Sequence, residues 1–409
     1  MQAGTEVFRF YRGMSTEAKY IICSSVLPSV AYGMFYTDIA YFLTTVQGLS
    51  YNLMGIIVTI MGVSTFATSI PMGIAADKYG RKRLLILSNV IASIIIAAFA
   101  LTTNPALLIT AAVFEGVSEA ASSASLSALL AEKAEDVKRN SVFSMFGFAQ
   151  STAFGVGGIA ILATQKMTGF SDKSIHVLLY VVLAALSLAS TVIIFKVHES
   201  KSTKADATLR ELLPSKSKKV LAQYVLTGAI IALGAGMVVP LMTAWMKARY
   251  GIPDSLSGPI LGVSSIVIGL ATLASPWLAK KFGLINAIVV TEAVSTIFMF
   301  ATPLSQDYIV ASVVYTWRAF LMNMSSPLAQ SMIMGLVPED ERGAASGISA
   351  ALWRLPNALS SFVGAWLIGL GLLAAPFFIA TGLYIVSIGL FWYFYRNIKM
   401  PEEQVNKGK

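Results

Sequence analysis

Twelve long apolar runs decide what this chain can fold into. A helix needs about 20 apolar residues to cross the hydrocarbon core of a bilayer, and each run is about that long or longer. Only 12% of the residues are charged, whereas a soluble domain carries about 25%. The sequence therefore predicts an all-α membrane protein with about twelve transmembrane helices. The predicted spans are 20–46, 52–76, 84–103, 106–131, 141–164, 175–196, 220–246, 256–279, 284–303, 307–336, 344–370 and 374–396.

Matching residues recur 203 positions apart along the chain. Gly33 is matched by Gly236, and Gly80 is matched by Gly283. A repeat of this length predicts two six-helix halves with the same topology, related by a pseudo-two-fold axis along the membrane normal. The predicted parts are an N-terminal half at 1–195, a cytoplasmic linker at 196–219 and a C-terminal half at 220–409.

The net charge is +9, and of the 30 Lys and Arg residues we place 24 in cytoplasmic segments. Positive residues accumulate in short cytoplasmic loops, so their distribution predicts a multi-pass protein of the cell membrane with both termini in the cytoplasm. This bias, together with attraction to anionic lipid headgroups, accounts for the basic charge without a nucleic-acid partner. We expect the chain to be a monomer whose partners are the lipid bilayer and small molecules.

Several classes of site are excluded by the residues that the sequence lacks. The single Cys23 excludes a disulfide framework and a thiolate metal cluster. Only two histidines, His176 and His198, are present, so a His-based metal site is not expected. The sequence also has no Walker loop and no nucleophile elbow. It therefore predicts no metal, no cofactor and no enzymatic activity.

A short basic turn, GIAADKYGRKR, joins two apolar runs at residues 73–83. The pattern of Gly73, Asp77 and Gly80 followed by basic residues closely resembles the loop signature of the major facilitator superfamily of secondary transporters. In that family the Gly lets two helices approach, the Asp faces a helix N-terminus in the other half, and the basic residues anchor the loop. The alternative is an ordinary positively charged cytoplasmic loop. The resemblance implies a conformational latch formed by Gly73, Asp77, Gly80 and Arg81.

The resemblance covers the whole chain and is closest to the proton-coupled drug and solute exporters, with two departures. In the fourth predicted helix, Ala112 takes the position at which many members carry an Arg. In the fifth, Gly157 and Gly158 keep the last glycine pair of the exporter signature, but the preceding Gly-Pro is missing. These departures weaken the case for a drug antiporter in particular, and not the case for a transporter.

Two carboxylates lie on one face of the fourth predicted helix. Glu115 and Glu119 are four residues apart, and Glu115 is about 15 Å from the outer end of its helix, near the midplane. A charge there costs roughly 3 kcal/mol, so intramembrane carboxylates are candidates for function. We predict that these two side chains couple transport to protons; the alternative is a pair that is permanently neutralised by its neighbours.

Asp38 is a third candidate for proton coupling, in the outer third of the first predicted helix. It resembles the helix 1 carboxylate that binds protons or cationic substrates in several exporters of the superfamily. The alternative is a residue that only forms a hydrogen bond to a neighbouring helix. The superfamily also lines its central cavity with helices 1, 4, 7 and 10. The predicted substrate cavity comprises Tyr32, Tyr36, Arg318, Trp317, Asn323 and Arg354.

The leading prediction is a secondary active transporter that works by alternating access and exports amphiphilic or cationic small molecules in exchange for protons. Abundant Met and aromatic residues favour varied ligands, because such surfaces repack around them. One alternative is symport or uniport of an anionic or sugar-like solute that contacts Arg318 and Arg354. Another is a membrane receptor of the same fold that does not transport, since a fold alone does not fix a function.

Overall fold

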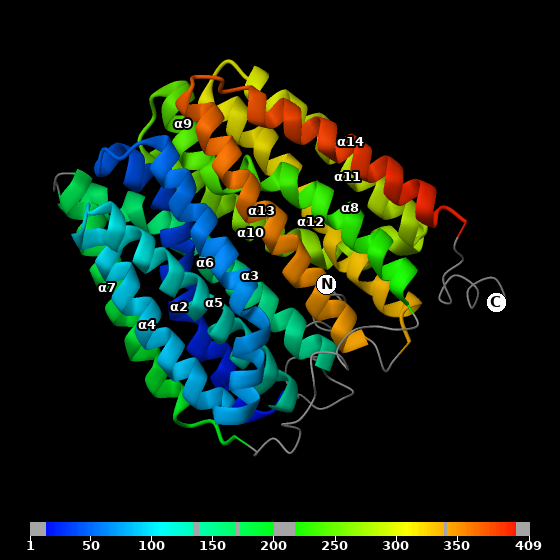
Figure 1. The fold of residues 1–409 in the computed structure, drawn as a ribbon, viewed down its shortest axis with the longest axis horizontal. Helices are drawn as coiled ribbons and strands as arrows, with labels where there is room; N and C mark the ends of the chain where they lie inside the picture. Colours follow the sequence, from blue (N-terminus) through cyan, green and yellow to red (C-terminus); the bar gives the residue numbers. More distant parts are fainter. Residues whose placement is uncertain (1–13, 134–138, 169–171, 200–216, 339–341, 398–409) are drawn as a thin grey trace, which may run out of the picture. The chain divides into compact units, whose positions relative to one another are not determined.

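The computed structural model describes residues 14–133, 139–168, 172–199, 217–338 and 342–397, which are helical almost throughout (Figure 1). The sequence prediction of an all-α chain is confirmed for these residues. In chain order the helical elements are α2 (Thr16–Tyr41), η1 (Phe42–Val46), α3 (Tyr51–Tyr79), α4 (Arg81–Leu101), α5 (Pro105–Lys133), α6 (Arg139–Thr168), α7 (Asp172–Ile194), α8 (Lys218–Gly236), η3 (Val239–Leu241), α9 (Met242–Tyr250), α10 (Asp254–Phe282), α11 (Leu284–Ala301), η4 (Thr302–Leu304), α12 (Tyr308–Leu336), α13 (Arg342–Gly369) and α14 (Ala375–Tyr395).

Each predicted span corresponds to a helical segment, with ends that differ by a few residues. The seventh span is made of three pieces, α8, η3 and α9, because Pro240 has no N–H for the helical ladder. Among the described residues, nine helices are long and apolar enough to cross a membrane. The agreement supports the twelve-helix architecture that the apolar runs predict.

The helices divide into two compact units, of which the first contains Met1–Leu49, Val63–Ala205 and Asp254–Ile266. In this unit α2 packs against α6 and α7, and α4 packs against α5 and α7. Glycines permit the closest of these approaches. A Cβ added to Gly157 of α6 would come 2.5 Å from the amide nitrogen of Met34 in α2, which is closer than atoms can approach.

The second unit contains Ser50–Gly62, Asp206–Pro253 and Val267–Lys409. Here α8 packs against α13 and α14, and α11 packs against α12 and α14. These pairs repeat the order of pairs in the first unit, as the repeat of 203 residues predicts. The close approach recurs as well, since a Cβ on Gly364 of α13 would come 2.8 Å from the Cα atom of Met237.

The two units do not coincide with the predicted halves, because α3 and α10 each have residues in both. The first twelve residues of α3 belong to the second unit, and the first part of α10 belongs to the first unit. Most of the predicted linker lies outside the described residues. The boundaries at 1–195, 196–219 and 220–409 therefore stay a prediction.

Candidate functional site

Asp38 lies near the C-terminal end of α2, and the local sequence explains how the helix is held. Ser15 caps the helix, since its hydroxyl accepts a hydrogen bond from Ala18 N and donates one to Lys133 O in α5. Beyond Tyr41 the helix continues as the π-helical turn η1. Gln47 then donates its amide N–H groups to Phe99 O and to the carbonyl of residue 102 at the end of α4. Both ends of the segment are thus attached to neighbouring helices.

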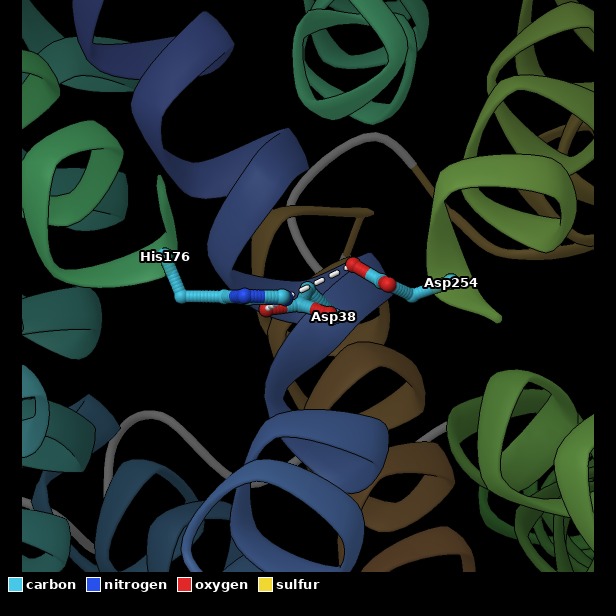
Figure 2. Close-up of side chains that lie close together, drawn as sticks. All are labelled: Asp38, His176 and Asp254. Carbon is cyan, nitrogen blue, oxygen red and sulfur yellow. Dashed lines mark hydrogen bonds and ion pairs between the residues drawn. The ribbon is translucent and has the colours of Figure 1, made fainter. Parts of the chain in front are cut away.

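Three titratable side chains meet inside the first unit, one from each of α2, α7 and α10. Figure 2 shows the imidazole of His176 extending from α7 toward Asp254 at the start of α10, with Asp38 of α2 beside it. The Nε2 atom of His176 is 2.7 Å from Oδ2 of Asp254 and 3.5 Å from Oδ2 of Asp38. All three side chains are 0% exposed. We call Asp38, His176 and Asp254 the triad.

Aromatic rings fix the position of the imidazole. Tyr41 and Phe42 are stacked on the ring of His176, with centroids 6.1 and 5.5 Å away. The hydroxyl of Tyr180, one helical turn along α7, donates a 3.2 Å hydrogen bond to Oδ2 of Asp38. Each carboxylate of the triad therefore receives at least one donor through Oδ2.

The other oxygen of each carboxylate has no such donor. Oδ1 of Asp38 and Oδ1 of Asp254 are buried and have no hydrogen-bond partner in the described part of the chain. Buried polar atoms almost always have a hydrogen-bond partner, so two carboxylate oxygens without one at the same site indicate a missing ligand. The arrangement can hold a proton on either carboxylate.

The ligand-capable atoms of the triad all lie within 4.8 Å of one another, a spacing at which three side chains could hold a metal ion. Metal–ligand bonds to N and O atoms are about 2.0–2.2 Å long. The 2.7 Å contact between Nε2 of His176 and Oδ2 of Asp254 is a direct hydrogen bond, shorter than the roughly 3.0–3.4 Å that separates neighbouring ligand atoms of one ion at these bond lengths. In this arrangement the triad is suited to binding a proton and not a metal ion.

Sequence reasoning found Asp38 but missed its two partners. His176 lies inside the predicted span 175–196, but a single histidine does not stand out there as a carboxylate does. Asp254 lies two residues before the predicted span 256–279, outside the apolar run. A search for polar residues near the ends of spans, rather than charges inside them, would have found both.

Glu115 and Glu119 lie on α5, as predicted, and their surroundings differ. Glu115 is buried. Glu119 is half-buried, and one of its carboxylate oxygens accepts a 3.0 Å hydrogen bond from the hydroxyl of Thr65 in α3. On the same helix, the hydroxyl of Ser118 donates to Ser88 O of α4. The structure places both glutamates inside the first unit, and their role in proton coupling stays a prediction.

The predicted cavity residues of α2 form an aromatic pair. The rings of Tyr32 and Tyr36 lie 4.9 Å apart, and Tyr32 also meets Phe154 of α6 edge to face. Both tyrosines are half-buried, whereas the side chains of the triad are fully buried. They form an amphipathic surface of the kind that binds apolar ligands with a polar edge.

The predicted cavity residues of α12 have unequal environments. Arg318 is buried, its guanidinium lies 4.9 Å from the ring centre of Tyr315, and its Nη1 is 3.5 Å from the hydroxyl of Tyr384 in α14. Trp317, in contrast, is half exposed, and Asn323 donates its side-chain N–H to a carbonyl one turn earlier. Arg318 is thus packed among tyrosines of its own unit. Arg354 of α13 is half-buried.

The basic turn is anchored by carboxylates, which the sequence did not predict. Gly80 has a φ of +104°, which only glycine adopts without strain, and α4 begins directly after it. Glu199 accepts hydrogen bonds from the backbone N–H groups of Arg81 and residue 82, and the side chain of Arg81 pairs with Glu132 of α5 at 3.3 Å. Gly73 lies within α3. The side chain of Asp77 lies outside the described residues, so the latch stays a prediction.

The family model of the Major Facilitator Superfamily matches residues 21–361 and 224–409. Multidrug resistance protein 2 of Bacillus subtilis is 22% identical over 351 residues, which cover 84% of this chain and 87% of that protein. An uncharacterized MFS-type transporter of the same organism, YqjV, is 23% identical over 395 residues, covering 93% of this chain and 94% of its own length.

Solved structures share the fold as well. The nucleoside transporter NupG superposes with a TM-score of 0.76 at 14% identity, covering 94% of this chain and all of that chain. At this identity the likeness shows the fold alone. It agrees with the twelve-helix, two-half architecture that the repeat predicts.

Proposed function

This chain belongs to the major facilitator superfamily, and from that premise we propose that it exports amphiphilic or cationic small molecules in exchange for protons. Family membership makes it a multi-pass membrane transporter of small molecules and not an enzyme, as the sequence predicted. Proton exchange, the direction of transport and the substrate class go beyond family membership and are part of the proposal.

One observation carries the proposal of proton coupling. Two carboxylates and one imidazole are fully enclosed in the first unit, and each carboxylate keeps one oxygen without a partner. Burying a net charge is costly, so such groups mark ion pathways and proton relays in membrane proteins. Glu115, buried on α5, and Glu119, beside it on the same helix, are further candidates to carry a proton.

The substrate class is supported by two observations. The similar protein from Bacillus subtilis is named for multidrug resistance. In this chain, the half-buried aromatic pair of Tyr32 and Tyr36 offers rings to an amphiphilic ligand, and ring faces also attract cations. We propose that Tyr32 and Tyr36 contact the substrate, and that the chain acts as a monomer in the cell membrane with both termini in the cytoplasm.

A second candidate is transport of an anionic solute. Arg318 is buried and has no carboxylate within ion-pair distance among the described residues of its own unit. A buried guanidinium binds carboxylates and phosphates well. The contacts of Arg318 with Tyr315 and Tyr384 leave its Nε without a hydrogen-bond partner among the described residues. The relative named for multidrug resistance favours the first candidate, so we rank this function second.

The substrate class can be tested with purified protein in liposomes under an imposed pH gradient. Pools of lipophilic cations, organic anions and sugars are supplied separately, and accumulation is measured. We expect accumulation from the lipophilic cation pool only, and no effect of Arg318→Gln on it. Accumulation from the organic anion pool that Arg318→Gln abolishes would favour the second candidate instead.

A further inference from the structure

We infer that His176 and Asp254 complete a proton-binding site around Asp38, in which Asp38 carries the exchanged proton and the other two residues set how tightly it is held. The inference rests on the proposed function, because it names the groups that would perform its proton exchange. It can nevertheless be tested without any transport measurement. Neither His176 nor Asp254 has a role in the predictions made from the sequence.

The charges of the triad require one exchangeable proton. With a protonated imidazole and two ionised carboxylates, the enclosed cluster carries a net charge of −1. Binding of one proton by a carboxylate makes the cluster neutral, and release of that proton restores the charge. Because a net charge without solvent is costly, the cluster takes up a proton when it is enclosed and can lose it when water reaches it.

The geometry selects Asp38 as the carrier of this proton. Asp254 is the first residue of α10, where the positive end of the helix dipole stabilises an ionised carboxylate. It also accepts the shorter contact from Nε2 of His176, 2.7 Å against 3.5 Å for Asp38. Asp38 lies within α2, away from a helix N-terminus. The charged form is therefore better stabilised at Asp254, and the proton goes to Asp38.

Few titratable groups face Asp38, so the effect of each one on the protonation of Asp38 can be measured separately. In the described part of the chain they are His176 and Tyr180 from α7 and Asp254 from α10. Tyr41, on the helix of Asp38 itself, is stacked on the imidazole. Tyr180 donates to Asp38 and is neutral, so the two charges that act on Asp38 are those of His176 and Asp254.

The fold does not need the triad, which argues for a functional role. The second repeat packs α8 against α13 and α14 as the first packs α2 against α6 and α7. At the spacing of 203 residues the triad corresponds to Leu241, Ile379 and Tyr51. Moreover, neither α8 nor α14 contains an acidic residue or a histidine. The same helix packing is thus built without these charges in the second unit.

The test follows the C=O stretch of a protonated carboxylic acid in infrared spectra of the full-length protein in liposomes as the pH is varied. We expect a band that titrates with pH and is lost in Asp38→Asn. Asp254→Asn removes a negative charge beside Asp38 and should move the titration of Asp38 to lower pH. His176→Gln removes a positive charge and should move that titration to higher pH. Each shift should be about 1–3 pH units. Asp307→Asn, at the start of α12, and His198→Gln, which is exposed, are matched controls that should not move it.

Opposite shifts in the two charge variants would support the site, because they would show that Asp254 and His176 set how tightly Asp38 holds its proton. If one variant does not fold, the other still decides, because each shift has its own direction. A titration that stays in place in both variants, or a band that survives Asp38→Asn, would overturn the inference. A band that responds to Zn²⁺ and not to pH would also overturn it, by making the triad a metal site. Flux that fails while the band titrates as expected would instead refute the proposed function.

Discussion

Replacement of Gly157 by Ala tests the close approach of α2 and α6, which positions the helix that carries Asp38. The added Cβ would lie 2.5 Å from Met34 N, about 0.9 Å inside the 3.4 Å at which ordinary contact begins, and closer still to Val30 O. The obstructing atoms belong to the backbone of α2, so no side chain can rotate away. The two helices must move apart along their contact.

The expected cost can be bounded. Overpacking of a close interface costs about 1–3 kcal/mol, while Ala in place of Gly within a helix gains about 1 kcal/mol. Gly147 of α6 serves as the control, because nothing lies within 4 Å of a Cβ added there. The Gly147→Ala variant should therefore be as stable as the wild type, or more stable by up to about 1 kcal/mol. The Gly157→Ala variant should be less stable than the Gly147→Ala variant by about 1–3 kcal/mol.

The free energies are measured by reversible unfolding in mixed detergent and SDS, with melting temperatures as a check. Comparison of the two alanine variants removes the propensity contribution, because both substitutions lie in the same helix. Equal stability of Gly157→Ala and Gly147→Ala would refute the reasoning, since it would mean that the helices are not in contact at this glycine.

Two further predictions concern single side chains. Glu17 accepts hydrogen bonds from the backbone N–H of His198 and from the side chain of Lys133, and these lower its pKa from 4.5 to about 2. The carboxylate therefore adds stability above pH 4.5 that is lost as the pH falls toward 2. Glu17→Gln should lower the free energy of unfolding by at most about 1 kcal/mol at pH 7, because the ion pair with Lys133 is partly solvated. The melting temperatures of the variant and the parent protein should converge near pH 2. Trp245 is buried and donates its indole N–H to Leu373 O at 2.8 Å. Trp245→Phe should lower the free energy of unfolding by about 1–3 kcal/mol, and an unchanged melting temperature would contradict this.

Much of the fold follows from the sequence because the bilayer imposes simple rules. A span must be apolar, helical and about 20 residues long, so hydropathy locates it to within a few residues. The repeat of Gly33 at Gly236 predicted the shared packing, because both glycines lie where two helices touch. What hydropathy does not predict is local backbone form, such as the π-helical turn after Tyr41 or the break at Pro240.

The candidate site could be predicted only in part, for a physical reason. The carboxylate of Asp38 stands out because an acid inside an apolar run is costly. Its partners lie 138 and 216 positions away, and only the packing of α7 and α10 brings them to it. His176 is a single polar residue at the start of its predicted span, and Asp254 lies just outside the next one, so neither residue interrupts an apolar run. Side-chain proximity across helices is a tertiary property that the apolar pattern does not contain.

The central claim, proton coupling through Asp38, is tested most directly by proton movement in liposomes that contain a trapped pH dye. A lipophilic cation pool is added to wild type, to Asp38→Asn and to the double variant Glu115→Gln with Glu119→Gln. We predict that the cations drive proton movement in wild type, that Asp38→Asn abolishes it, and that the double variant reduces or abolishes it. Cation flux that is independent of the pH gradient and survives all of these substitutions would contradict the account.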